Sequence, residues 1–452
     1  MNKLVKPLLV LSIILNIALR FRLVEIFSQY PIQAMNPYSD ESGYFNLGLH
    51  LWEWLLHGHA ARLPLYPAFL SLFVQNGLPE AVIYIVQHLL FMGSALAICC
   101  ALFAKWNWRL TAFNLIIYYG PFVTSPNGAL SETFTASMML LALSVFIRGE
   151  KSIWGRLSGA FLFGLLSLSR PNFLPLFPLI LTALFITKQL PLKSLILMLL
   201  IFTLPVAGWM CRNRAIQGSW LYNSSSGPVI YMASRMVPPY CPDEMGYFND
   251  VFGTNRPQNL LISLGEVMKN SYGQDNMHIY MPVKSNNPSM MNEVLGNRNY
   301  KKLALENYTY YILNRPDLLL YKVSNWLTGY MTTGMATFEY SCYRNGSYLH
   351  SRLIGILYVL AVFYDVLFFP AGLVALILSG FVIVRFPNRL SDYRLTVLLY
   401  ALLCFSLISP IPTFVGNRFT IIQMLAIIVS CFYLIPACVA PWIRRENEHS
   451  AG

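Results

Sequence analysis

Residues 131–187 read SETFTASMMLLALSVFIRGEKSIWGRLSGAFLFGLLSLSRPNFLPLFPLILTALFIT. The stretch holds three apolar runs, at 131–147, 156–169 and 172–187, and its charged residues gather mainly in the two short connections between them. Apolar runs at such close spacing are typical of a chain that crosses a lipid bilayer repeatedly, because about 30 Å of hydrocarbon must be spanned. We therefore expect a polytopic membrane protein, and the rest of the sequence agrees.

The composition excludes a soluble globular protein. Hydrophobic residues make up 56% of the chain and charged residues 12%, and the mean hydropathy is +0.50. A soluble domain of this length needs a more polar surface. The formal charge of +12 raises the alternative of nucleic-acid binding, but the basic residues are scattered between apolar runs and form no stripe with aromatics. We expect no nucleic-acid partner.

The apolar runs predict an all-α fold with about ten transmembrane helices, of which several shorter ones are half-crossing or tilted. The first run is followed by Arg20-Phe21-Arg22 rather than by a small-residue cleavage site, so we interpret it as a retained helix and not as a signal peptide. The predicted spans are 5–22, 80–104, 109–125, 131–147, 156–169, 172–187, 194–211, 361–384, 395–409 and 419–440.

Alternate loops carry the basic residues, which indicates that they face the cytoplasm. These residues are Lys3, Lys6, Lys105, Arg109, Arg148, Lys151, Arg156, Lys188, Lys193, Arg385, Arg389, Arg394, Arg444 and Arg445. The other loops then face the periplasm or the exterior, and both termini lie inside. We expect a location in the plasma membrane (the inner membrane of a bacterium).

The outward loops divide the chain into three parts. Residues 1–211 form an N-terminal transmembrane module with a first outward loop at 24–79, where short interfacial helices are expected. Residues 212–351 form a small extracytoplasmic segment, and 352–452 supply the C-terminal transmembrane helices. Cys241 and Cys342 fall in the extracytoplasmic segment, where a disulfide between them is one open alternative.

Ionisable residues cluster on the predicted outward face, although they are spread over nearly the whole sequence. Such groups at the ends of membrane helices are costly and are therefore functional candidates. Each also has a simpler interpretation: Glu132 would complement the dipole of its helix, and Arg170 would anchor at the interface. The group comprises Asp40, Glu41, Glu132, Arg170, Arg212, Arg214 and Arg418, and the neutral Asn213 stands between two of the arginines.

Carboxylates that face several arginines suit a reaction in which a hydroxyl or amine is activated and an anion departs. A carboxylate takes the proton of the acceptor as general base. Arginines bind the departing phosphate through paired hydrogen bonds and stabilise its growing charge. A lipid-linked phosphate sugar fits this chemistry, because its tail stays in the bilayer while its head reaches the outward surface.

The order of these residues resembles the GT-C superfamily of polyprenyl-phosphate-sugar-dependent glycosyltransferases, and most closely the branch of protein O-mannosyltransferases and lipid A aminoarabinose transferases. The likeness covers most of residues 1–235 and only loosely the C-terminal third. The motifs that carry it are Asp40-Glu41, Arg62 with Pro64-Leu65-Tyr66-Pro67, Ser131-Glu132, Ser169-Arg170-Pro171-Asn172, Trp209 with Arg212-Asn213, Ser224 to Gly227 and Asn417-Arg418-Phe419.

The resemblance implies a membrane glycosyltransferase of GT-C-like fold. It would transfer a sugar from a polyprenyl phosphate to a glycan, lipid or protein acceptor of the cell envelope, with inversion. The cofactor is open, and a divalent cation such as Mg or Mn would bind Asp40 and Glu41. The implied roles are Asp40, Glu41 and Glu132 in catalysis; Arg62, Arg170, Arg212 and Arg418 on the donor phosphate; and Tyr44, Asn172 and Asn213 on the substrate.

Phe419 stands where the family often has tyrosine, and the large outward segment lies between the seventh and eighth predicted spans, so the acceptor does not carry over from the relatives. Three alternatives stay open. An O-antigen polymerase or ligase would also set arginines of an outward loop against a lipid pyrophosphate. A lipid or sugar transporter would place polar residues at mid-membrane. The third is a structural subunit of an envelope assembly.

Overall fold

The computed structural model describes most of the membrane helices and their short connections. The chain divides into two compact units, 1–222 with 330–409 and 417–452, and 223–329 with 410–416. Apart from three isolated helical residues (305, 309 and 313), every described residue belongs to the first unit. The described ranges are 5–29, 40–58, 62–128, 130–218, 220, 222, 352–390, 392–409 and 421–450, without the side chains of 40–41, 151, 352–358, 389 and 440–450.

The expected all-α architecture is confirmed for this part of the chain, which contains helices and no strand. A helix overlaps each of the ten predicted spans. These helices are α1 (Val5–Ser28), α5 (Glu80–Leu102), α6 (Trp106–Ile117), α8 (Ser131–Arg148), α9 (Ile153–Ser167), α10 (Leu176–Ile186), α11 (Leu192–Gln217), α19 (Arg352–Arg385), α20 (Tyr393–Ile408) and α21 (Ile421–Ser450).

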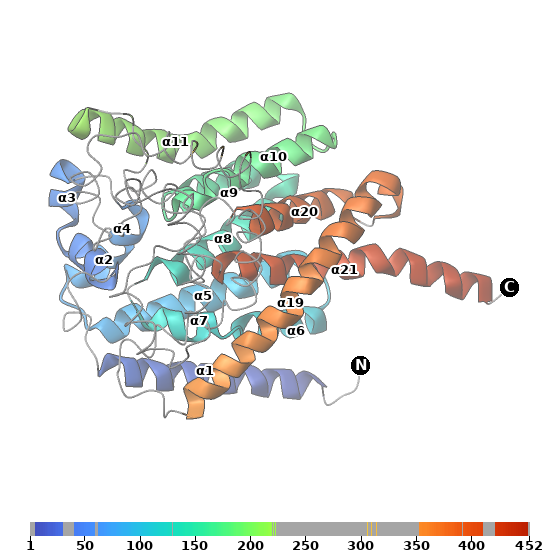
Figure 1. The fold of residues 1–452 in the computed structure, drawn as a ribbon, viewed down its shortest axis with the longest axis horizontal. Coiled ribbons are helices and arrows are strands. Elements are labelled where there is room, and N and C mark those ends of the chain that lie inside the picture. Colours follow the sequence, from blue (N-terminus) through green and yellow to red (C-terminus); the bar gives the residue numbers. More distant parts are fainter. Residues whose placement is uncertain are drawn as a thin grey trace. The chain divides into compact units, whose positions relative to one another are not determined.

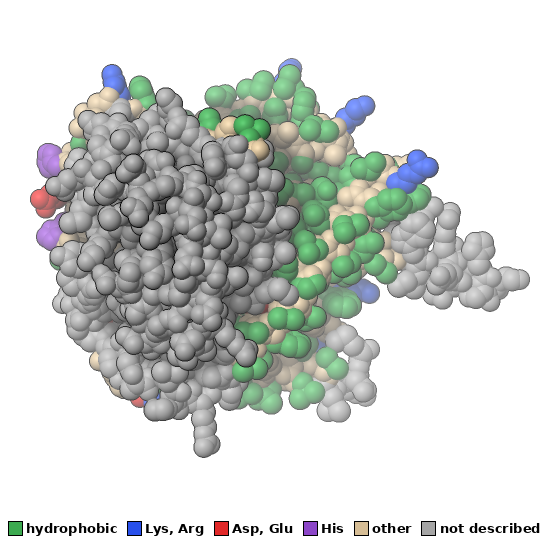
Figure 2. Space-filling view, in the orientation of Figure 1, with side chains coloured by type: hydrophobic (Ala, Val, Ile, Leu, Met, Phe, Trp, Pro, Cys, Tyr) green, Lys and Arg blue, Asp and Glu red, His purple; other side chains and the backbone are tan. Residues whose placement is uncertain are grey.

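Five of these helices are long and apolar enough to cross a membrane: α1, α5, α11, Val359–Arg385 of α19 and Ile421–Val439 of α21. Other apolar helices, such as α9, α10 and α20, are shorter than the roughly 20 residues that a perpendicular crossing needs. Large hydrophobic side chains are exposed over the described helices, and Figure 2 shows them as a broad green face with Lys and Arg near its margins. Several helices thus have membrane-spanning character, while the count of about ten crossings stays a prediction.

The prediction of one continuous helix over 109–125 is wrong. Helix α6 ends at Ile117, and the chain turns before the short helices α7 (Pro121–Thr124) and η2 (Ser125–Asn127). Pro121 and Pro126 each stand at the first turn of a new helix, where a missing backbone N–H does no harm. Apolar composition alone does not reveal this interruption, which brings a polar segment to the start of α8.

Helix α8 is the centre of the bundle, and nearly every residue along it is buried. It packs between α5 and α9, and α9 in turn packs on α11. Gly164 permits a close approach of the latter two, because a Cβ there would meet the carbonyl oxygen of Phe202 at 2.4 Å. Helices α19, α20 and α21 pack on one another, and α20 also contacts α10 (Figure 1).

Loops that were expected to share a membrane face do lie together. At one end of the bundle, Arg394 in the first turn of α20 forms an ion pair at 3.0 Å with Glu150, which lies in the connection after α8. At the other end lie α2 (Asp40–Leu49), α3 (Leu51–His57) and α4 (Leu65–Val74), away from the start of α1 (Figure 1). The first outward loop thus contains the short helices expected of it; which end faces outward stays a prediction.

Candidate active site

The first turn of α8 holds a buried carboxylate. Glu132 is the second residue of the helix, and its side chain is 1% exposed. The positive end of the helix dipole favours an acidic residue at this position. A positively charged partner for this carboxylate comes from the turn between α9 and α10.

Arg170 brings a guanidinium to Glu132 from the turn between α9 and α10. It directly precedes the 3₁₀ turn η4 (Pro171–Phe173), in extended backbone conformation. Its Nη2 lies 2.6 Å from Oε1 of Glu132, and its Nε donates to Oγ of Ser131 at 3.2 Å. Only 12% of the Arg170 side chain is exposed. The structure therefore brings together Glu132 and Arg170, which lie on separate predicted outward turns, and the carboxylate orients the arginine.

Arg62 and Tyr44, from the first outward loop, also lie together. The Arg62 guanidinium carbon is 4.7 Å from the centre of the Tyr44 ring, a cation–π distance. Tyr44 is buried and meets the ring of Tyr66 edge to face at 5.1 Å. Tyr66 in turn contacts Phe134 of α8 at 5.6 Å. Aromatic packing thus joins Tyr44 of the first outward loop to α8, the helix that carries Glu132.

Gln87 of α5 holds the segment that leads into α8. Its amide nitrogen donates to the carbonyl oxygens of Pro126 and Gly128, both at 2.9 Å, and its Oε1 accepts from the hydroxyl of Tyr66 at 3.1 Å. Gln87 is fully buried. One side chain thus ties the first outward loop to the turn that leads into α8.

Arg212 is anchored to α3. Its Nε donates to the carbonyl oxygen of Leu55, its Nη2 to those of Trp54 and Gly58, and its Nη1 to Oδ1 of Asn213, at 2.5 to 2.9 Å. Four of the five N–H donors of an arginine are used in this way. Three of these donors reach backbone carbonyls at the C-terminal end of α3, where Trp54 also accepts from the N–H of Gly58 at 2.8 Å, and the fourth reaches the side chain of Asn213. The predicted phosphate-binding role of Arg212 stays a prediction, but the contacts give it a positioning role.

Tyr222 connects this anchor to the turn that holds Arg170. Its hydroxyl donates to the carbonyl oxygen of Ser167, and its own carbonyl oxygen accepts from Nε1 of Trp209 at 2.8 Å. Burial raises the pKa of Tyr222, so the hydroxyl keeps the proton that it donates. Trp209 packs with Leu168, and the backbone N–H of Leu65 donates to the Leu168 carbonyl at 3.2 Å.

The remaining predicted site residues are placed less completely. Asp40 and Glu41 open α2, one turn before Tyr44, and their side chains lie outside the described ones. Asn172 is in η4, two residues after Arg170. Arg418, Cys241 and Cys342 lie outside the described residues. Among the described side chains no group of three His, Cys, Asp or Glu could hold a metal ion, so a cation at Asp40 and Glu41 stays a prediction.

Sequence reasoning missed several buried polar residues inside the apolar helices. Asp365 of α19 is fully buried and accepts a hydrogen bond from the hydroxyl of Tyr119 at 3.0 Å. Arg20 of α1 is 2% exposed and contacts Nδ1 of His88 at 2.8 Å. Nε2 of His88 lies 3.1 Å from Oδ1 of Asn127. A charged residue within an apolar run was the available signal.

The described part of the site places two arginines at one end of the bundle. One arginine is fixed by a buried carboxylate, and a second stacks on a tyrosine at the same end of the bundle. An acidic pair begins the adjacent helix. No family model, curated protein or solved structure matches the chain, so the function has to be argued from this arrangement alone.

Proposed function

We propose that the chain is an inverting membrane glycosyltransferase that moves a sugar from a polyprenyl phosphate to an acceptor of the cell envelope on the outward face. The observation that carries the proposal is the 2.6 Å pair between Glu132 and Arg170, at the same end of the bundle as Arg62 and Asp40. A cation held by a buried carboxylate is well suited to an anionic leaving group, because its geometry is fixed before the reaction begins.

In the proposed reaction, Asp40 takes the proton from the acceptor hydroxyl. The acceptor oxygen forms a bond to the anomeric carbon of the sugar while the bond between that carbon and the phosphate oxygen breaks. The electron pair of the broken bond stays on the phosphate, whose added negative charge Arg170 and Arg62 stabilise. Attack from the side opposite the leaving group inverts the anomeric carbon.

The structure changes how the remaining residues enter the proposal. The contact of Glu132 with Arg170 supports a positioning role for Glu132, with Asp40 as the base. Arg212 holds α3 and thereby shapes the first outward loop. A divalent cation at Asp40 and Glu41 would bind carboxylate oxygens, which Mg²⁺ and Mn²⁺ favour.

A transporter is the second candidate, and two observations favour it. Asp365 and the Arg20–His88 pair are buried within helices of membrane-spanning character, where ionisable groups are often part of a substrate or proton path. No such groups were expected from the sequence. The two candidates differ in what they require: a transporter needs Asp365, and the transferase needs Asp40.

The test is single-turnover transfer in detergent, with short-chain polyprenyl-phosphate sugars as donors. We expect Asp40→Asn to lower transfer by at least about 100-fold, the lower range for loss of a general base. Glu53→Gln is the matched control, because Glu53 is an exposed carboxylate of the same loop. Normal turnover by folded Asp40→Asn would remove the base assignment. If no such donor bound or reacted with the wild type, the transferase would be excluded and the transporter favoured.

A further inference from the structure

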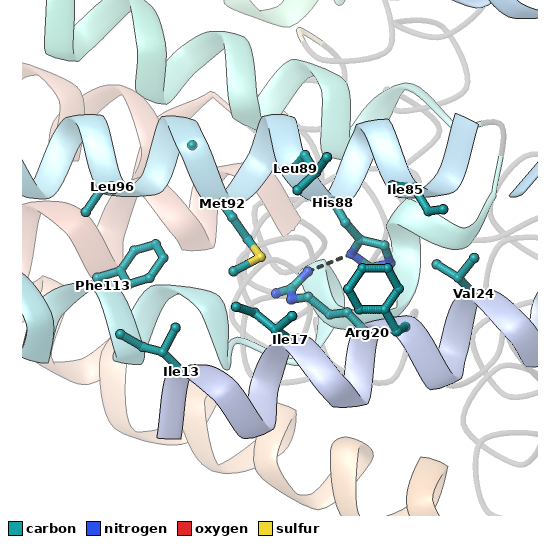
Figure 3. A pocket seen from close by; sticks show the side chains of 12 residues that line it. Ile13, Ile17, Arg20, Val24, Ile85, His88, Leu89, Met92, Leu96 and Phe113 are labelled. Carbon is teal, nitrogen blue, oxygen red and sulfur yellow. Dashed lines mark hydrogen bonds between the residues drawn. The ribbon is translucent and has the colours of Figure 1, made fainter. Parts of the chain in front are cut away.

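A groove of about 390 Å³ lies between α1 and α5, away from the site described above. Figure 3 shows the two helices side by side, with Ile13 and Ile17 of α1 facing Met92 and Leu96 of α5. Phe113 of α6 closes one side. Arg20 and His88 are the polar residues in its lining. The groove is therefore almost wholly hydrocarbon in character.

The dimensions of the groove match one half of a bilayer. Its lining on α1 runs from Ile13 to Val24, and on α5 from Ile85 to Leu96. Eleven helical steps of 1.5 Å give a length of about 16 Å. The hydrocarbon core is about 30 Å thick, so a chain that fills the groove has about the length of one leaflet. Both helices are among those with membrane-spanning character.

The rim of the groove is exposed and apolar. Phe21 is 56% exposed and Leu89 is 61% exposed, and both also line the groove. Beside them on α1, Ile14 is 56% exposed. In a membrane these side chains would meet lipid, so the groove would be reached from the bilayer and not from water.

Arg20 decides which part of a lipid fits. Its guanidinium bonds to Oδ1 of Asn16, to His88 and to the carbonyl oxygens of Ile117 and Phe122. These partners satisfy four of the five donors of an arginine, and the side chain is 2% exposed. An anionic headgroup would find little of this cation to bind. A hydrocarbon chain would instead exclude water from the bonds and strengthen them.

We propose that the groove between α1, α5 and α6 binds one acyl chain of a bilayer phospholipid. The headgroup lies at the end marked by Val24 and Ile85, because Val24 is about one turn from the end of α1 and Ile85 is five residues from the start of α5. The bound chain covers the Arg20–His88 pair. That pair holds the segment before α8 through Phe122 and Asn127, so the lipid also supports the candidate site.

Gly93 offers a way to close the groove. It is in the lining, and a Cβ added there would meet no heavy atom within 4 Å, so the side chain of Gly93→Leu can begin there without a clash and we expect it to fill the groove. Gly208 of α11 is the matched control: a Cβ there is equally unhindered, and the residue lies outside the groove.

The experiment uses the full chain in nanodiscs of palmitoyl-oleoyl phosphatidylcholine that contain a fraction of phosphatidylcholine with a diazirine in one acyl chain. After irradiation, labelled residues are mapped by mass spectrometry. We expect the lining of α1 and α5 to be labelled about tenfold more than equally exposed residues of α11, which corresponds to a tenfold difference in affinity. Gly93→Leu should abolish the excess, and Gly208→Leu should leave it unchanged.

Three results would overturn the proposal. The first is even labelling of all exposed apolar residues, since that reflects bulk lipid only. The second is an unchanged excess in Gly93→Leu. The third is loss of the excess on addition of a few mole per cent of polyprenyl phosphate, which would make the occupant a donor tail. The wild-type map decides the first and third results even if a variant folds poorly, and none of the three depends on transferase activity.

Discussion

Nη2 of Arg170 lies 2.6 Å from Oε1 of Glu132, although the two residues are 38 positions apart in the sequence. Glu132 is in the first turn of α8, and Arg170 directly precedes η4. The carboxylate is 1% exposed and the guanidinium side chain 12%. Such a pair costs much to desolvate, and removing one partner leaves a charge in surroundings of low polarity. Mutation of either residue can therefore measure how much the pair contributes to the stability of the fold.

We expect Glu132→Gln to lower the free energy of unfolding by about 3 kcal/mol, the lower range for breaking a buried ion pair. Glu150→Gln is the control, because the Glu150–Arg394 pair is more exposed, at 39% and 15%, and should cost less than about 1 kcal/mol. A double-mutant cycle with Arg170→Gln, measured by unfolding in mixed detergent micelles, gives the coupling. Equal losses for Glu132→Gln and Glu150→Gln would show that the Arg170 pair is not buried in the membrane-embedded protein.

The anchoring of α3 by Arg212 gives a second prediction. Arg212→Lys keeps the charge but loses the planar fork that reaches the carbonyls of Trp54, Leu55 and Gly58. Hydrogen bonds to a charged group contribute about 1.5–3 kcal/mol each, so we expect a loss of at least about 2 kcal/mol. Arg214→Lys is the control, because the Arg214 side-chain contact is to the Gly218 carbonyl in an exposed turn.

Hydrogen exchange locates the effect of Arg212→Lys. Amides of α3 should exchange faster in the variant, while those of α8 stay protected, because only the former helix loses its cap. If both helices exchanged at the wild-type rate, the guanidinium would be free of α3 in solution, and the predicted phosphate-binding role would gain support.

The sequence was sufficient to predict the all-α architecture of the described residues. Apolar runs depend on local composition, and a helix overlaps each predicted span, although the span 109–125 is interrupted. The break at Tyr118–Gly120 was missed because the residues around it are as apolar as a span. From the sequence, Glu132 was predicted either to complement the dipole of its helix or to act in catalysis, and its ionic contact with Arg170 depends on the fold.

The roles of Gln87 and Asp365 could not be predicted, for a different reason. Asp365 is the one charged residue of its apolar run and Gln87 stands beside His88 in another, and their partners come from distant segments: Tyr66 and the Pro126 carbonyl for Gln87, and Tyr119 for Asp365. Only the packing of helices brings such groups together. A pattern along one helix contains no information about which neighbour supplies the partner.

Gln87→Leu provides a third prediction. The change keeps much of the volume but leaves the carbonyls of Pro126 and Gly128 and the hydroxyl of Tyr66 without this partner. An unsatisfied buried polar group costs about 1–3 kcal/mol, so we expect a combined loss of about 3 kcal/mol. Gln75→Leu is the control, because its amide donates to carbonyls at the more exposed end of α2. A loss no greater than that of Gln75→Leu would mean that other contacts hold the turn before α8.

Asp365→Asn distinguishes the two candidate functions. The amide oxygen of asparagine still accepts a hydrogen bond from Tyr119, so we expect the unfolding free energy to fall by no more than about 1 kcal/mol. A transferase with its chemistry at the α2–α4 end needs no charge at this position, and single-turnover transfer should stay within about threefold of wild type. Substrate-coupled transport in proteoliposomes that is lost in Asp365→Asn would instead establish a transporter. Tyr119→Phe serves as the reciprocal control, because it removes the hydrogen bond that Asp365→Asn keeps and retains the carboxylate that Asp365→Asn removes. It should leave charge-dependent transport active.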